Sequence, residues 1–194
     1  AQLGPAVGPV VITRIGPGAS MLSKEEILKM PNTELATSLA DFKEKDIWEG
    51  PTARGLAEML KQVVQDKPEK FVDDMKPFLK TGYLYMYYIF WGLRDAWSNK
   101  KDFNWQKLFN FINVYLEQEE FWKNELPIVG ERGWNPDHKT VVGGISELIK
   151  EGAKDDERVF PDALFDNARQ ILLLIFDRLS PTSEEEIMRD HVTH

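Results

Sequence analysis

Apolar residues follow helical spacing along most of the chain, and one stretch is apolar on every side. Residues 83–93 are all apolar or aromatic except Gly92, and the run continues to Trp97 without a helix-breaking residue. This length predicts a helix of about four turns. A helix with no polar face is buried on all sides, and this one is too short to span a bilayer. We therefore expect it to be the central helix of a folded core, with Ile89, Phe90 and Trp91 among its most buried residues.

The other segments predict amphipathic helices separated by proline, glycine and asparagine. Their apolar stripes recur every three or four residues, as at Leu56, Leu60 and Val63, and no segment alternates with the period of a strand. Residues 171–176 form a second nearly all-apolar run, so we expect Ile175 and Phe176 to be deeply buried. These patterns predict an all-α fold.

Several helix starts carry recognisable capping signals. Ser23 with Glu26 three residues later has the spacing of a capping box. Asn32 and the Asn135-Pro136 pair are predicted to begin later helices. Residues 1–20 hold four glycines and three prolines, which predicts an extended arm or linker, and residues 21–194 are then a single helical domain.

The domain contains an apparent internal repeat. Residues 55–61 (GLAEMLK) align with residues 144–150 (GISELIK) at an offset of 89, and an offset of 86 superimposes the two apolar runs. The repeating units would span about residues 48–93 and 134–179. A close helix–helix contact would explain why Gly55 and Gly144 both lie within helices. Chance likeness between amphipathic helices is the alternative.

Helix order and unit length resemble α-helical repeat proteins of the HEAT/armadillo kind, whose hairpins run about 40–47 residues. The pattern Trp48-Glu49-Gly50-Pro51, followed by Arg54-Gly55-Leu56-Ala57, is similar to segments of very large, poorly characterised bacterial proteins with helical repeats. This resemblance implies stacked antiparallel hairpins and a scaffolding or partner-binding role, and it carries over no catalytic residue. Uneven helix lengths leave an irregular helical bundle around the two apolar helices as the other architecture.

Composition narrows the classes of partner. The net charge is −8 and the pI is near 5.0, which disfavours nucleic acid and anionic membrane surfaces. The chain has no cysteine, so disulfides and thiolate chemistry are absent. A secretory signal pattern is also missing from the N-terminal residues. We expect a cytoplasmic protein.

Two tryptophans are the candidate partner-binding residues. Trp48 and Trp134 each lie in a loop beside glycine and proline, before one of the two repeat units. An aromatic residue there either plugs the end of a hairpin or contacts a partner. Both interpretations stay open at this point.

No set of residues in the sequence indicates catalysis. His191 and His194 lack the glutamate and cysteine neighbours of a zinc site, and His138 has no nucleophile placed beside it. The acidic run at Glu117, Glu119 and Glu120 is typical of a solvated helix end. We expect no metal and no cofactor.

The sequence favours a non-enzymatic helical-repeat interaction domain. The alternative is an all-α enzyme or regulatory ligand-binding domain whose pocket gathers distant polar residues such as Glu58, Arg94 and Glu147. Residues 183–194 predict a last helix with Ile187, Met188 and Val192 on one face. Because that face needs a cover, we expect the chain to be a fragment of a longer protein, with this helix either frayed or weakly self-associated with another copy.

Overall fold

A computed structural model describes residues 18–44, 50–130, 134–154 and 158–180 of the chain. The described residues form helices and short 3-10 turns, in this order: α1 (Lys24–Lys29), α2 (Asn32–Asp41), α3 (Ala53–Asp66), α4 (Pro68–Val72), η1 (Lys76–Lys80), α5 (Tyr83–Ser98), α6 (Trp105–Leu116), α7 (Glu119–Trp122), α8 (His138–Gly152), η2 (Asp162–Leu164) and α9 (Phe165–Leu179). The only extended pairing among them is an isolated bridge between Ala19 and Pro51. The prediction of an all-α fold is confirmed.

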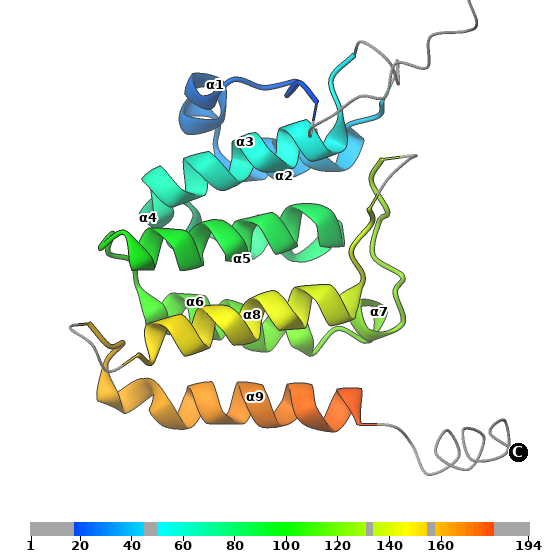
Figure 1. The fold of residues 1–194 in the computed structure, drawn as a ribbon. Coiled ribbons are helices and arrows are strands. Elements are labelled where there is room, and N and C mark those ends of the chain that lie inside the picture. Colours follow the sequence, from blue (N-terminus) through cyan, green and yellow to red (C-terminus); the bar gives the residue numbers. More distant parts are fainter. Residues whose placement is uncertain (1–17, 45–49, 131–133, 155–157, 181–194) are drawn as a thin grey trace, which may run out of the picture.

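The helices succeed one another along the molecule in chain order (Figure 1). Helices α3, α5 and α8 lie side by side in a front row, and α5 packs along both of its neighbours. Helices α2 and α6 lie farther back, behind α3 and α8. Helix α9 packs against both α6 and α8 at the far end of the stack.

Helix α5 occupies the centre, as its apolar sequence predicts. Ile89 and Phe90 are fully buried, and Phe90 packs its ring near those of Phe111 and Tyr115. The buried residues connect into one cluster that reaches from Ile27 in α1 to Ile175 in α9. Trp91 departs from the prediction, because its ring is only partly buried on the front of the row.

Helix α9 also departs from its predicted burial. Ile175 is 6% exposed, but Phe176 is 69% exposed, so the expectation that Phe176 belongs to the core is wrong. The reason is position, since among the described residues α9 has neighbours on one side only, whereas α5 lies between two helices. An apolar run in the sequence cannot distinguish a central helix from one at the end of a stack.

The two glycines of the apparent repeat have different surroundings. A Cβ on Gly55 would lie 2.3 Å from the backbone oxygen of Ala19, in the segment before α1. A Cβ on Gly144 would instead meet the Tyr87 ring of α5, at an ordinary 3.4 Å. The expected close helix–helix contact is therefore wrong for Gly55. Close helix–helix approaches occur instead at Gly92, where α5 meets the backbone of α3, and at Gly152, where α8 meets the Trp105 ring of α6.

The capping predictions are partly confirmed. Ser23 and Glu26 form the predicted capping box at α1. Asn32 lies inside α2 and donates its side-chain amide to the carbonyl oxygens of Lys70 and Asp74, at 2.9 and 2.8 Å, so its assignment as a cap is wrong. Asp137, rather than the Asn135-Pro136 pair, caps α8.

Candidate functional site

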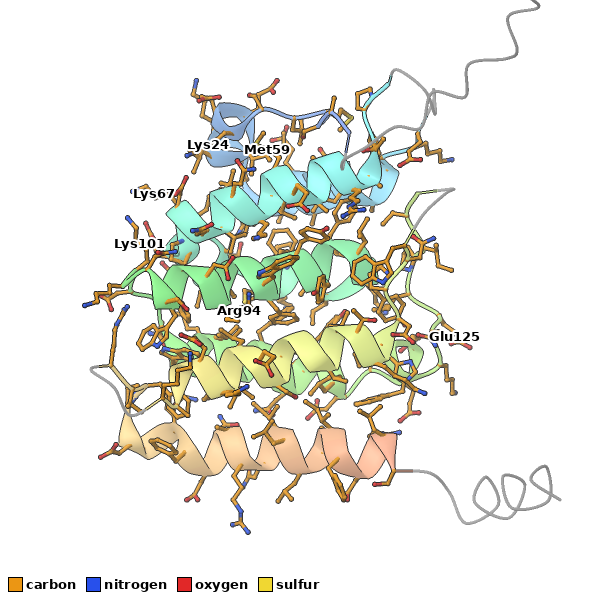
Figure 2. The ribbon with its side chains drawn as sticks, in the orientation of Figure 1. Lys24, Met59, Lys67, Arg94, Lys101 and Glu125 are labelled. Atoms are coloured by element: carbon orange, nitrogen blue, oxygen red, sulfur yellow. The ribbon has the colours of Figure 1, made fainter. Side chains whose placement is uncertain are left out.

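A groove runs between α5 and α8 on the front row and encloses about 380 Å³. Helix α5 contributes Tyr87, Trp91 and Arg94, which recur at helical spacing and so share one side of the helix. The facing residues of α8 are Thr140, Gly143, Gly144, Ser146 and Glu147. Figure 2 labels Arg94 between the ribbons of these two helices.

Packing on both sides of α5 leaves only this strip of the helix uncovered. Tyr87, Trp91 and Arg94 are partly exposed, whereas the residues next to them, such as Tyr88 and Leu93, are buried. The Tyr87 and Trp91 rings meet edge to face, with centroids 5.7 Å apart. The apolar character of α5 therefore continues from the core out to the groove and gives it an aromatic wall.

On the opposite side of the groove, α8 has two adjacent glycines, Gly143 and Gly144, and so no side chains project there. A Cβ placed on Gly143 would meet no atom within 4 Å, so this position opens directly into free space. A Cβ on Gly144 would just reach the Tyr87 ring. The absence of two side chains keeps the aromatic wall accessible.

Cations flank the aromatic wall on the α3 side. The Lys61 ammonium lies 3.8 Å from the centroid of the Trp91 ring, close enough for a cation–π interaction. Its Nζ also lies 3.3 Å from a carboxylate oxygen of Asp95, and Arg94 contacts the other oxygen at 3.0 Å. Asp95 thus pairs with two cations that both lie near the Trp91 ring.

Trp134 extends the same aromatic surface toward the start of α8. Its ring stands edge to face on Tyr87, with centroids 5.3 Å apart, and 48% of the residue remains exposed. The structure therefore joins the predicted site residue Trp134 to the groove, with one side packed and the other facing solvent. Trp48 lies outside the described residues.

Two polar groups near the groove have hydrogen-bond partners within the fold. The Ser146 hydroxyl donates to the carbonyl oxygen of Val142 in its own helix, at 2.8 Å. His138 lies 2.9 Å from the side-chain oxygen of Asn124, and burial lowers the pKa of its imidazole. Among the described residues, no group of three or more potential metal ligands comes together.

The polar residues named for the enzymatic alternative are only partly brought together. Arg94 and Glu147 both line the groove, but each has a charged neighbour, Asp95 and Lys150 respectively. Glu58 lies on α3 and accepts a hydrogen bond from the Tyr88 hydroxyl at 3.0 Å. Of the three residues, Arg94 and Glu147 therefore line the groove and Glu58 does not.

A larger hollow of about 640 Å³ lies between α2 and η1. Its lining consists of threonine, alanine, lysine and proline with one aspartate, and it includes no aromatic residue. Protein-binding hot spots are enriched in tryptophan, tyrosine and arginine. The smaller groove has all three residue types, so we consider it the better candidate.

Comparison of the chain with known protein families, with curated proteins and with solved structures finds no match. Among the described residues, no helix combines the length and the apolar character needed to cross a membrane.

The sequence makes Trp134 a candidate but does not point to Tyr87, Trp91 or Gly143 beside it. Tyr87 and Trp91 belong to the apolar run, which predicts burial in the core. One signal was present, because the adjacent glycines at 143 and 144 are costly inside a helix and indicate a place where side chains are excluded. The partner wall on α5 could not be identified without knowing which side of that helix stays uncovered.

Proposed function

We propose that the chain is a non-enzymatic interaction domain of the helical-repeat kind, and that the groove between α5 and α8 binds a segment of a protein partner. One observation carries the proposal: Tyr87, Trp91, Arg94 and Trp134 form a continuous, partly exposed surface beside the two glycines of α8. Aromatic rings and arginine supply large contact areas at low entropic cost. The succession of helices in Figure 1 supports the helical-repeat assignment.

The groove suits one peptide-sized segment better than a small substrate. Its wall is aromatic and the charges of Arg94 and Glu147 are paired. The hydroxyls of Ser146 and Thr140 donate to the Val142 carbonyl and the Asp137 carboxylate. A bound side chain could rest on Tyr87 and Trp91 with its backbone passing over Gly143, where no Cβ obstructs it. Scaffold proteins commonly use an exposed face of this kind, because affinity then comes from a few anchors.

A blocking variant offers a direct test. Random peptides of about 12 residues are selected for binding to the wild-type protein, and their affinities are measured by calorimetry. Gly143→Gln should weaken the selected peptides at least about tenfold, or 1.4 kcal/mol, because its side chain enters the groove. Trp134→Ala should have a similar effect by removing an anchor.

Gly143→Ala is the matched control, since it makes a similar change to helix propensity with a much smaller side chain. It should retain most of the binding. Circular dichroism spectra of all variants should match that of the wild type, because both positions are exposed. If no selected peptide is sensitive to Gly143→Gln or Trp134→Ala, the groove is not the binding site.

A further inference from the structure

Helix α9 carries a second apolar stripe that the described residues leave uncovered. Its inner side consists of buried Ala168, Ile171 and Ile175, and buried Leu164 at the end of η2 precedes them. The second stripe contains the exposed residues Phe165, Leu172, Leu173, Phe176 and Leu179. At 100° per residue, its centre lies roughly a quarter turn around the helix from the buried side. A helix that docks on this stripe would therefore lie beside α9, a quarter turn around its axis from the side that packs on α6 and α8.

Large exposed apolar patches mark interaction surfaces. Phe176 is 69% exposed and Leu173 is 50% exposed, so the stripe is well open to solvent. The spacing of Phe165, Leu172, Phe176 and Leu179 is seven, four and three residues, which is the spacing of a helix-packing seam. The natural occupant is another amphipathic helix.

We propose that residues 184–192 of the same chain form this helix and dock antiparallel along the exposed stripe of α9. These residues lie outside the described ranges, but their sequence is given and they follow directly after α9. Ser183 and Glu186 have capping-box spacing, and Ile187, Met188, His191 and Val192 then share one face. The predicted helix at residues 184–192, with its apolar face, therefore follows α9, whose apolar stripe is uncovered, directly in the chain.

The connection has the right length for a helical hairpin. Helix α9 ends at Leu179, and the predicted helix begins at Glu184, which leaves residues 180–183 as the connection. Helical hairpins commonly use loops of two to five residues. In the antiparallel arrangement Ile187 lies opposite Phe176, and His191 lies opposite Leu172. A short tether also gives this segment a local concentration in the millimolar range, which favours it over a second copy of the chain.

The cysteine-free sequence permits a direct test on the full chain. The pair Phe176→Cys with Ile187→Cys places thiols on the two proposed facing surfaces. The control pair, Phe176→Cys with Asp190→Cys, places the second thiol on the outer side of the same segment. Under mild oxidation, the first pair should form an intrachain disulfide at least about tenfold faster than the control, as followed by mass spectrometry after thiol quenching.

Each other outcome overturns the proposal. Equal rates for the two pairs would show that the tether alone brings the thiols together. Disulfide-linked dimers through Cys at position 176 would show that a second copy covers the stripe. Phe176 is exposed, so its replacement leaves the core intact, and the reduced variants should retain the wild-type circular dichroism spectrum.

Hydrogen exchange gives an independent measurement without cysteines. Replacing Ile187 and Val192 together by Asp should increase amide exchange in α9 at least about tenfold, because the apolar cover is lost. The matched double variant Glu185→Asp with Arg189→Lys keeps the charges and the apolar face, and should exchange like the wild type. Unchanged exchange in the first variant would contradict docking.

Discussion

At the residue scale, glycines decide how closely the helices approach. Gly92 lies where α5 crosses α3, and a Cβ there would come within 2.8 Å of the Lys61 carbonyl oxygen and 2.9 Å of the Val64 Cβ. These atoms belong to helix α3, one of them to its backbone, so they cannot move aside easily. Gly143 has open space around it instead. The same residue type thus serves close packing at one position and access to a groove at the other.

Gly92→Ala should destabilise the protein by about 1–3 kcal/mol, the usual cost of overpacking. Gly143→Ala should stabilise it by about 0.5–1 kcal/mol, because alanine is favoured over glycine in a helix and nothing obstructs its methyl group. Urea unfolding of both variants measures the difference. A stabilising Gly92→Ala would contradict the packing described for α3 and α5.

Two phenylalanines distinguish the central helix from the terminal one. Phe90 is fully buried, so Phe90→Ala should lower the free energy of unfolding by about 3–5 kcal/mol. Phe176 is 69% exposed among the described residues, so Phe176→Ala should cost clearly less than Phe90→Ala, about 1–2 kcal/mol when residues 184–192 dock on one side of it as proposed. Chemical denaturation of the two variants under identical conditions tests both values. A loss of about 3–5 kcal/mol for Phe176→Ala would mean that Phe176 belongs to the core.

At the element scale, helix starts depend on side chains that accept backbone hydrogen bonds. The Asp137 carboxylate accepts from the backbone N–H and the hydroxyl of Thr140, each at 2.9 Å, and so caps α8. Partial burial would raise the pKa of Asp137, but the hydrogen bonds from Thr140 outweigh it and lower the pKa. Folding therefore favours the ionised form of this cap.

Asp137→Ala should cost about 1 kcal/mol at neutral pH, as loss of an N-cap usually does. Because the pKa is lower in the folded state, the ionic part of this stability is complete above about pH 4, the unfolded pKa, and disappears as pH falls through the folded pKa. Asp137→Asn should preserve the cap at pH 7 and remove this pH dependence. Unfolding free energies measured between pH 2 and 7 would show it, and identical pH profiles for wild type and Asp137→Asn would contradict the assignment.

At the scale of the whole molecule, the buried residues form one cluster from α1 to α9. Neighbouring helices share this core, since α5 packs against both α3 and α8. A chain built in this way should unfold as one unit, although long repeat arrays can lose that cooperativity.

Far-UV circular dichroism and tryptophan fluorescence should therefore give coincident unfolding curves. Phe90→Ala should shift both midpoints together, because α5 lies at the centre of the shared core. Two separated transitions would indicate that the α1–α3 end and the α8–α9 end fold independently.

The sequence by itself determined the helical class, the burial of Ile89 and Phe90, and the capping box at Ser23. Each depends on local spacing, since a run without a polar face has to be covered and a serine three residues before a glutamate can cap its own helix. The all-α prediction follows from the same local rule. Trp134 was recognisable because an aromatic residue in a glycine- and proline-rich loop is unusual.

The tertiary structure alone decided which sides of the helices are covered. Trp91 faces a groove although its neighbours in sequence are buried, and Phe176 is exposed although its run resembles that of α5. Gly55 and Gly144 look equivalent in sequence but meet different elements. The physical reason is that burial depends on how many neighbours a helix has and how it is rotated against them, and these quantities are set by contacts between residues far apart in the chain.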